Sequence, residues 1–216
     1  MSIDAVIFDL DGTLWDSTAT VAESWNHTLY SVHGVEHSFT AADIAGIMGC
    51  TDKEIEEKLF RGFGERADVL CRSCMELEPA YVAVHGGSIY EGVETVLRTL
   101  CETLPLFIVS NCQCGYVEAF LSYSGYGNYF RDYEYLGRRG LSKRENIRLV
   151  MERHGLENCL YVGDTAHDEA SAKAAGCGFV HAAYGFGSAV EPLASIKTPM
   201  ELIGLISRLQ EEASHV

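Results

Sequence analysis

The stretch at residues 5–13, AVIFDLDGT, decides the fold that we expect for this chain of 216 residues. Residues 5–10 form a short apolar run, which is typical of a strand buried on both faces of a parallel sheet. The run ends in two carboxylates, Asp9 and Asp11, and Gly12 then permits a tight turn. Ligands of open α/β sheets bind beyond the carboxyl ends of the strands, so this stretch favours a functional site there.

Three later segments repeat the pattern of a buried parallel strand. They are 104–110 (LPLFIVS), 158–164 (NCLYVGD) and 178–182 (GFVHA). Helical patterns lie between them, and one helix is expected to open with a capping box at Ser142 and Glu145. Alternation of strands and helices after residue 86 predicts an α/β fold with a doubly wound, Rossmann-like parallel sheet.

Residues 16–85 break this alternation. Val21, Trp25 and Leu29 have the spacing of one helix face, and Thr40 and Thr51 have the pattern of further helix starts. No strand is expected in this segment. The sequence therefore predicts a catalytic core made of residues 1–15 and 86–216, with an inserted all-helical cap at 16–85.

Composition narrows the possible partners. The formal net charge is −15, from 31 acidic and 16 basic residues, and such a chain repels phosphate backbones, so we expect no nucleic-acid partner. No apolar run approaches the length of a membrane span, and the N-terminus has no basic leader, so we expect a cytoplasmic protein with reduced cysteines. The sequence leaves open a monomer or a homodimer, and a redox role for the closely spaced cysteines.

Polar side chains from four parts of the chain are expected at one edge of the sheet. Several are carboxylates, which repel one another at close range unless a divalent cation and a lysine neutralise them. The residues concerned are Asp9, Asp11, Ser110, Asn111, Lys143, Asp164 and Asp168.

These motifs resemble the haloacid dehalogenase-like hydrolase superfamily. The resemblance rests on DLDGTL at 9–14, SN at 110–111, SK at 142–143 and GDTAHD at 163–168, in this order. The helical insertion after the first motif resembles the cap of the phosphoglycolate phosphatase-like branch. The resemblance covers nearly the whole chain.

The resemblance implies a role for each motif residue. Asp9 would be the nucleophile that becomes an aspartyl-phosphate, and Asp11 would be the general acid and base. Mg²⁺ would be held by Asp9, Asp164 and the backbone carbonyl of Asp11, with help from Asp168. Ser110 and Lys143 would bind the phosphoryl oxygens, together with groups near Gly12, Thr13 and Asn111. An acid at position 11 favours phosphoryl transfer, because a halide leaving group needs no proton.

The substrate signal is weaker. The segment 46–50 interrupts a helical pattern with two glycines, and it is either a substrate loop containing Gly49 and Cys50 or an ordinary turn between helices. We expect a Mg²⁺-dependent phosphatase that acts on a small phosphorylated metabolite such as phosphoglycolate or a sugar phosphate. The first alternative is a mutase similar to β-phosphoglucomutase, although Lys53 stands where those enzymes tend to have an arginine.

The second alternative is a non-catalytic binding protein on the same scaffold. The presence of Asp9, Asp11, Lys143 and Asp164 together argues against it, because a scaffold without activity has no chemical need for all four.

Overall fold

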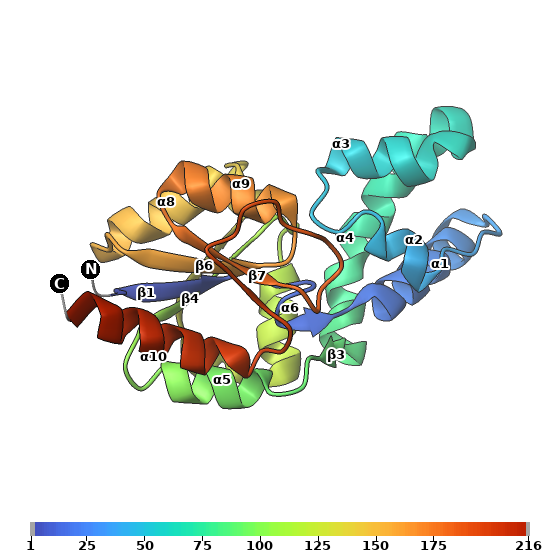
Figure 1. Cartoon of the computed structure of the whole chain (residues 1–216). Helices are drawn as coiled ribbons and strands as arrows, with labels where there is room; N and C mark the ends of the chain where they lie inside the picture. The colour runs from blue at the N-terminus through green and yellow to red at the C-terminus, as the bar shows by residue number, and fades with distance from the viewer. Residues whose placement is uncertain (1–2, 215–216) are drawn as a thin grey trace.

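The computed structural model describes residues 3–214, and its centre is a parallel sheet with helices on both faces (Figure 1). The order across the sheet is β5-β4-β1-β6-β7-β8. The strands are β1 (Ala5–Phe8), β4 (Leu106–Ser110), β5 (Phe130–Tyr135), β6 (Cys159–Gly163), β7 (Gly178–Ala182) and β8 (Ala194–Ile196). The strand order reverses at β1, between β4 and β6, which is where open α/β sheets bind ligands. The predicted doubly wound fold class is confirmed.

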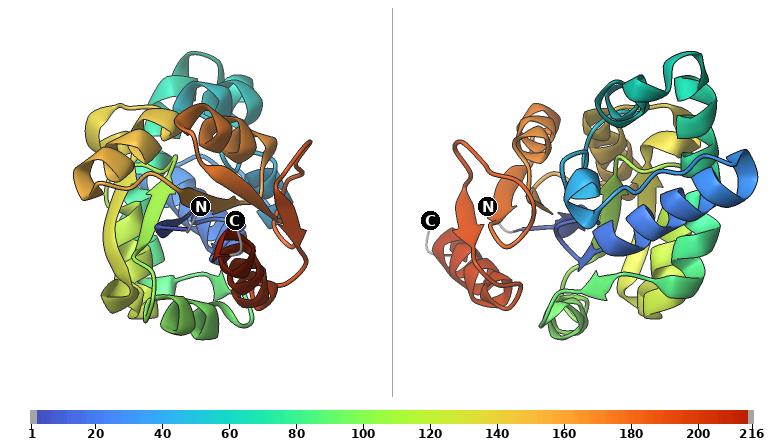
Figure 2. Two further views of the ribbon diagram at one scale, coloured as in Figure 1. Left: turned by 60° about the vertical axis from the view of Figure 1, so that its left-hand side comes forward. Right: turned by 90° about the vertical axis from the view of Figure 1, so that its right-hand side faces the viewer.

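Alternate side chains of β1 point into two different cores. Val6 and Phe8 pack into one and Ala5 and Ile7 into the other, and all four are buried, which explains the continuous apolar run. The first face is covered by α5 (Val93–Leu100), α6 (Tyr116–Ser124) and α10 (Glu201–Ser214), and the second by α8 (Lys143–His154) and α9 (Ala166–Ala175). Figure 2 shows the two helical layers on opposite sides of the sheet.

A helical cap lies beside the carboxyl ends of the strands (Figure 1). Trp25 is buried at its centre against Phe39 and Phe60, with ring centroids 5.7 and 5.5 Å away. The cap elements are α1 (Thr18–His33), α2 (Ala41–Ala45), α3 (Asp52–Ile55), the π-helical η1 (Glu56–Phe60), the 3₁₀-helical η2 (Arg61–Arg66) and α4 (Ala67–His85). The inserted all-helical cap of the predicted fold class is therefore present.

A short antiparallel ribbon joins the cap to the core. Its strands are β2 (Trp15–Asp16) and β3 (Ser88–Ile89), and Trp15 pairs with Ile89. The expectation of no strand within residues 16–85 was wrong at Asp16, because a two-residue strand has no periodicity that a sequence pattern can reveal. The ribbon places both ends of the cap at one point.

Other element limits differ slightly from the expectations. The last helix begins at Glu201, and residues 198–200 form a turn before it. Strands β5 and β8 were not predicted. Two short elements flank β5, namely η3 (Tyr126–Tyr129) before it and α7 (Leu136–Arg139) after it.

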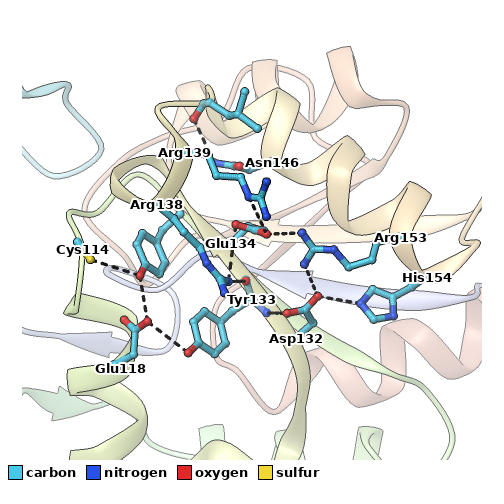
Figure 3. Close-up of polar contacts among 12 residues, drawn as sticks. Cys114, Glu118, Asp132, Tyr133, Glu134, Arg138, Arg139, Asn146, Arg153 and His154 are labelled. Carbon is cyan, nitrogen blue, oxygen red and sulfur yellow. Dashed lines mark hydrogen bonds and ion pairs between the residues drawn. The ribbon is translucent and has the colours of Figure 1, made fainter.

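The edge strand β5 carries charges that the core compensates. Glu134 is fully buried and pairs with Arg153 of α8, while Asp132 pairs with Arg153 at 2.5 Å and with His154 at 2.9 Å (Figure 3). This network ties β5 to α8 and makes the edge of the sheet charged, which opposes pairing with another chain.

No helix within residues 3–214 is long and apolar enough to cross a membrane.

Candidate active site

Three buried carboxylates meet at the carboxyl ends of β1 and β6. Asp9 follows β1 and Asp164 follows β6, and Asp168 reaches the same point from the first turn of α9. One oxygen from each of the three lies within 4.8 Å of the others. All three residues are less than a tenth exposed, so their charges need compensation from within the protein or from a ligand.

Lys143 supplies part of that compensation. It is the first residue of α8 and is only 2% exposed, and its Nζ lies 2.9 Å from Asp9 Oδ1 and 2.5 Å from Asp168 Oδ1. Burial lowers the pKa of Lys143, but the two carboxylates outweigh burial and hold it well above its ordinary value. Burial likewise raises the pKa of Asp168, yet its contacts with Lys143 and Thr165 lower it overall. Lys143 and Asp168 are therefore both charged.

Asp164 is held by a loop that follows β7. Its Oδ2 accepts hydrogen bonds from the backbone N–H of Phe186 at 2.7 Å and of Gly187 at 3.2 Å. A Cβ atom on Gly12 would lie 2.3 Å from the same oxygen, so only glycine permits this approach of the turn after β1 to Asp164. The loop was missed from the sequence, although the YGFG pattern at 184–187 after a strand could have revealed it.

The three carboxylates have two oxygens left for a cation. Lys143 occupies Asp9 Oδ1, backbone donors occupy Asp164 Oδ2, and Asp168 uses one oxygen for Lys143 and the other for Thr165. Within residues 3–214 no hydrogen bond engages Asp9 Oδ2 or Asp164 Oδ1. Two free carboxylate oxygens, which are hard ligands, fit a hard divalent cation that keeps several waters, so the site suits such an ion. Asp168 is placed to orient Lys143.

The pKa of Asp9 is raised to about 7, chiefly by burial; Lys143 opposes the shift, and the neighbouring Asp168 and Asp164 contribute to it. Burial and Asp168 raise the pKa of Asp164 to about 6. A cation at their free oxygens would hold both groups ionised.

Asp11 lies apart from the three clustered carboxylates and has its own partners. Its Oδ1 accepts hydrogen bonds from Ser17 Oγ at 2.6 Å and from Tyr116 OH at 3.0 Å. Burial raises the pKa of Asp11 to about 7, while the Ser17 and Tyr116 hydroxyls oppose the shift and Asp9 adds to it. A carboxyl group with that pKa can give and take a proton near neutral pH. Ser17 and Tyr116 were both missed from the sequence.

The remaining predicted residues divide into two sets. Ser110 and Asn111 line the same cavity as Asp9, and the Asn111 side chain donates to Gly49 O at 3.4 Å. In contrast, the backbone N–H groups of Gly12 and Thr13 donate to carbonyls within their own turn, at 2.9 and 3.2 Å. In this geometry they are not offered to a phosphoryl group.

A cavity of about 70 Å³ lies between the strand ends and the cap. The loop at 46–50 forms part of its wall, and Gly49 and Cys50 both line it. Gly49 adopts a left-handed φ of 78° and approaches Thr165 of the core, so this loop closes over the strand ends. Glu78, Gln113 and Tyr116 also line the cavity, and α4 of the cap contributes the first of these.

This fold and site define a hydrolase of a known class. The family model for haloacid dehalogenase-like hydrolases matches residues 6–182, so the chain belongs to that family, and the resemblance seen in its motifs is confirmed. A phosphoglycolate phosphatase from Photobacterium profundum is 29% identical over 211 residues, covering 85% of each chain. One from Synechococcus elongatus is 26% identical over 221 residues, covering 97% of this chain and all of the relative.

The fold has solved counterparts as well. A haloacid dehalogenase-like family hydrolase from Streptococcus pneumoniae superimposes with a TM-score of 0.81 at 19% identity, covering 94% of this chain and 98% of the other. At that identity the likeness concerns the fold, including the helical cap.

Proposed function

We propose that this hydrolase is a Mg²⁺-dependent phosphatase that cleaves small phosphomonoesters through an aspartyl-phosphate on Asp9. The observation that carries the proposal is the contact of Lys143 with both Asp9 and Asp168 beside Asp164, while Asp11 is held separately by two hydroxyls. In this proposal Asp9 is the carboxylate that attacks, and Asp11 is the one that transfers protons. The names of the two relatives support phosphatase activity.

In the first step Asp9 attacks the phosphorus atom. Its Oδ1, the oxygen beside Lys143, forms the new P–O bond while the bond from phosphorus to the alcohol oxygen breaks, and Oδ2 is left for the cation. Asp11, protonated because of its raised pKa, gives its proton to the departing alkoxide. Lys143 and Ser110 stabilise the transferring phosphoryl oxygens, since both line the cavity next to Asp9.

In the second step a water molecule attacks the same phosphorus atom. Asp11, now a carboxylate, takes the proton from the water, and the P–O bond to Asp9 breaks. Inorganic phosphate leaves and Asp9 is restored. The pKa of about 7 suits Asp11 to both roles, because each half of the cycle needs the opposite protonation state.

Asp9 Oδ2, Asp164 Oδ1 and the backbone carbonyl of Asp11 would hold the Mg²⁺. When bound, Mg²⁺ offsets the negative charge of the phosphoryl group so that a carboxylate can approach it. Asp168 would contribute by fixing Lys143, with which it makes a 2.5 Å contact.

Residues 16–85 would act as a lid over the core made of residues 1–15 and 86–216. Closure would exclude water from the cavity and set substrate choice through the loop at 46–50. Lys53, the residue on which a mutase reading depends, is highly exposed and pairs weakly with Glu57 at 4.0 Å. It does not line the catalytic cavity, so hydrolysis is the better supported reaction.

The test is release of inorganic phosphate from a panel of phosphorylated metabolites and p-nitrophenyl phosphate. We expect turnover with Mg²⁺, none in excess EDTA, and loss of turnover to background in Asp9→Asn. Ca²⁺ should inhibit, because its looser coordination misplaces the nucleophile. Full turnover in excess chelator would contradict the metal role, and an active Asp9→Asn would contradict the covalent one.

A further inference from the structure

The part of the cavity away from the phosphoryl site must receive the alcohol portion of the substrate. Its walls there come mainly from the cap and are largely apolar: Val21, Trp25, Ile44, Ile47 and Met75. The apolar walls are interrupted by Glu78 of α4, which is only 5% exposed. A carboxyl group in that position contacts the alcohol portion of a bound substrate, so its charge and hydrogen bonds affect which substrates bind.

Glu78 is fixed in position by two hydrogen-bond donors. Trp25 Nε1 donates to its Oε2 at 2.5 Å, and Gln113 Nε2 donates to its Oε1 at 2.7 Å. Gln113 also donates to Met75 O at 3.4 Å, so its amide is oriented as a donor toward Glu78. Both protein partners donate, and each carboxyl oxygen of Glu78 can accept a further bond. Burial raises the pKa of Glu78 to about 8, and a hydrogen-bond donor from a ligand would favour the ionised form.

Within residues 3–214, no free cation lines the cavity beside Glu78. Among the described residues that line this cavity, Lys143 is the one permanent cation, and Asp9 and Asp168 already engage it. Lys58 comes near but lies outside the lining. Its Nζ is 3.1 Å from Cys50 Sγ and 3.5 Å from Gly46 O, on an exposed part of the loop.

A second cavity, of about 510 Å³, shares Met75 and Gln113 with the first, and it is acidic as well. Four carboxylates and two cations line it, namely Asp52, Glu56, Asp68, Glu76, Lys53 and Arg72. Arg72 is paired with Asp68. Carboxylates therefore outnumber cations in the second cavity, so it supplies no excess positive charge next to the first.

We propose that this surface, centred on Glu78, selects phosphomonoesters whose alcohol portion ends in a hydrogen-bond donor, a hydroxyl or an ammonium group, and rejects those that end in a carboxylate. A substrate carboxylate would have to leave water beside another carboxyl group with no counter-charge. A donor would instead meet a fixed acceptor in an apolar cavity. This inference rests on the proposed phosphatase function, and it departs from phosphoglycolate, the substrate in the names of the two relatives.

Three esters of nearly equal size separate the possibilities: phosphoglycolate, 2-hydroxyethyl phosphate and 2-aminoethyl phosphate. They differ only in ending in a carboxylate, a hydroxyl or an ammonium group. With the native protein and Mg²⁺, we expect kcat/KM for at least one donor-bearing ester to exceed that for phosphoglycolate by about tenfold or more. A preference for the ammonium ester would identify a charge-based selection, and a preference for the hydroxyl ester a hydrogen-bond-based one.

A kcat/KM for phosphoglycolate equal to or above both others would overturn the inference. Turnover of p-nitrophenyl phosphate, which has no such terminal group, keeps this result distinct from failure of the phosphatase proposal. If no ester is cleaved, including this one, the proposed function is wrong and the inference falls with it.

The matched variants are Glu78→Gln and Lys58→Met. Glu78→Gln keeps the side-chain shape but can no longer ionise toward a donor, so the ratio of kcat/KM for phosphoglycolate to that for the donor-bearing ester should rise about tenfold. A purely structural role for Glu78 would lower all three rates in proportion. Lys58→Met should leave the ratio unchanged, and selective loss of phosphoglycolate turnover in Lys58→Met would show that Lys58 binds the carboxylate and that the inference is wrong. If Glu78→Gln fails to fold, the comparison of the three esters with the native protein still tests the inference.

Discussion

The behaviour of Asp11 depends on two hydroxyl groups that come from distant parts of the chain. Ser17 follows the short strand β2, and Tyr116 opens α6. Both donate to Asp11 Oδ1, and hydrogen bonds to the charged form of a carboxyl group favour that form. They are positioning residues, and they limit how far burial can raise the pKa of Asp11.

Replacing Ser17 by alanine should raise the pKa of Asp11. A hydrogen bond to a charged group is worth about 1.5–3 kcal/mol, so an upward shift of about one to two pKa units is expected. Phosphorylation needs protonated Asp11, and kcat/KM therefore falls as pH rises through its pKa. The basic limb of the profile for an alkyl ester should move to higher pH in Ser17→Ala.

Tyr116→Phe should shift the basic limb in the same direction. Tyr184→Phe is the control, since the Tyr184 hydroxyl donates to Thr13 O at 2.9 Å and does not touch Asp11. A basic limb that stays in place while the rate falls would contradict the positioning role.

Some of the site could be predicted residue by residue, and some could not. Asp9, Asp11, Lys143, Asp164 and Asp168 belong to short motifs, and parallel strands bring such motifs to one edge. The partners of Asp11 and Asp164 were missed. They join residues that are 6, 105 and 22 positions apart, and the two longer separations require knowledge of which elements pack together.

At the scale of elements, features that depend on neighbouring residues in the sequence could be predicted, and features that depend on contacts between distant segments could not. The capping boxes at Thr40, Thr51 and Ser142 are present, because each is formed by residues three positions apart. Strand β5 (FRDYEY) was missed, since its charged residues oppose the pattern of a buried strand. Its stability depends on Arg153, which lies on a helix later in the chain (Figure 3).

Glu134→Gln should therefore destabilise the protein without impairing the chemistry. Glu134 is fully buried, and removing its charge leaves Arg153 with a partner only in Asp132, so we expect a loss of about 1–3 kcal/mol in the free energy of unfolding. The network lies at the far end of α8 from Lys143, so kcat/KM should stay within about twofold. Urea unfolding measures the loss.

Asp68→Asn provides the comparison for Glu134→Gln. Asp68 pairs with Arg72 on the exposed surface of the cap, and exposed pairs contribute about 0–1 kcal/mol. Equal losses for the two variants would show that the Glu134 network contributes no more than a surface pair.

At the scale of the whole molecule, the core and the cap contribute different parts of the site. The core brings the carboxylates and Lys143 together, while the cap supplies most of the apolar wall and Glu78. The cap joins the core at the ribbon of β2 and β3. Gly87 lies close to this ribbon. A Cβ atom added to Gly87 would be 2.8 Å from Asp16 O, so a side chain at this position would clash with the backbone of β2.

This division predicts which properties a cap substitution changes. Ile47→Ala and Met48→Ala remove apolar wall from the cavity without touching the carboxylates. We expect them to change the order of kcat/KM values across a substrate panel, while the Mg²⁺ concentration for half-maximal activity stays within about twofold. An unchanged order would mean that the loop at 46–50 is only a connector.

The central claim, that Asp9 is phosphorylated and that Asp11 moves the protons, is tested most directly in Asp11→Asn with an aryl phosphate. A nitrophenolate leaves without a proton, so Asp9 should still be phosphorylated. Hydrolysis of the aspartyl-phosphate lacks its base and should slow by roughly 10²–10⁴.

Intact mass spectrometry of the mixture of Asp11→Asn, Mg²⁺ and p-nitrophenyl phosphate is the decisive measurement. We predict one added phosphoryl group, located on Asp9 by peptide mapping, together with a burst of nitrophenolate and a slow steady state. Unmodified protein, no burst, and an equal loss of rate for alkyl and aryl esters would contradict the mechanism.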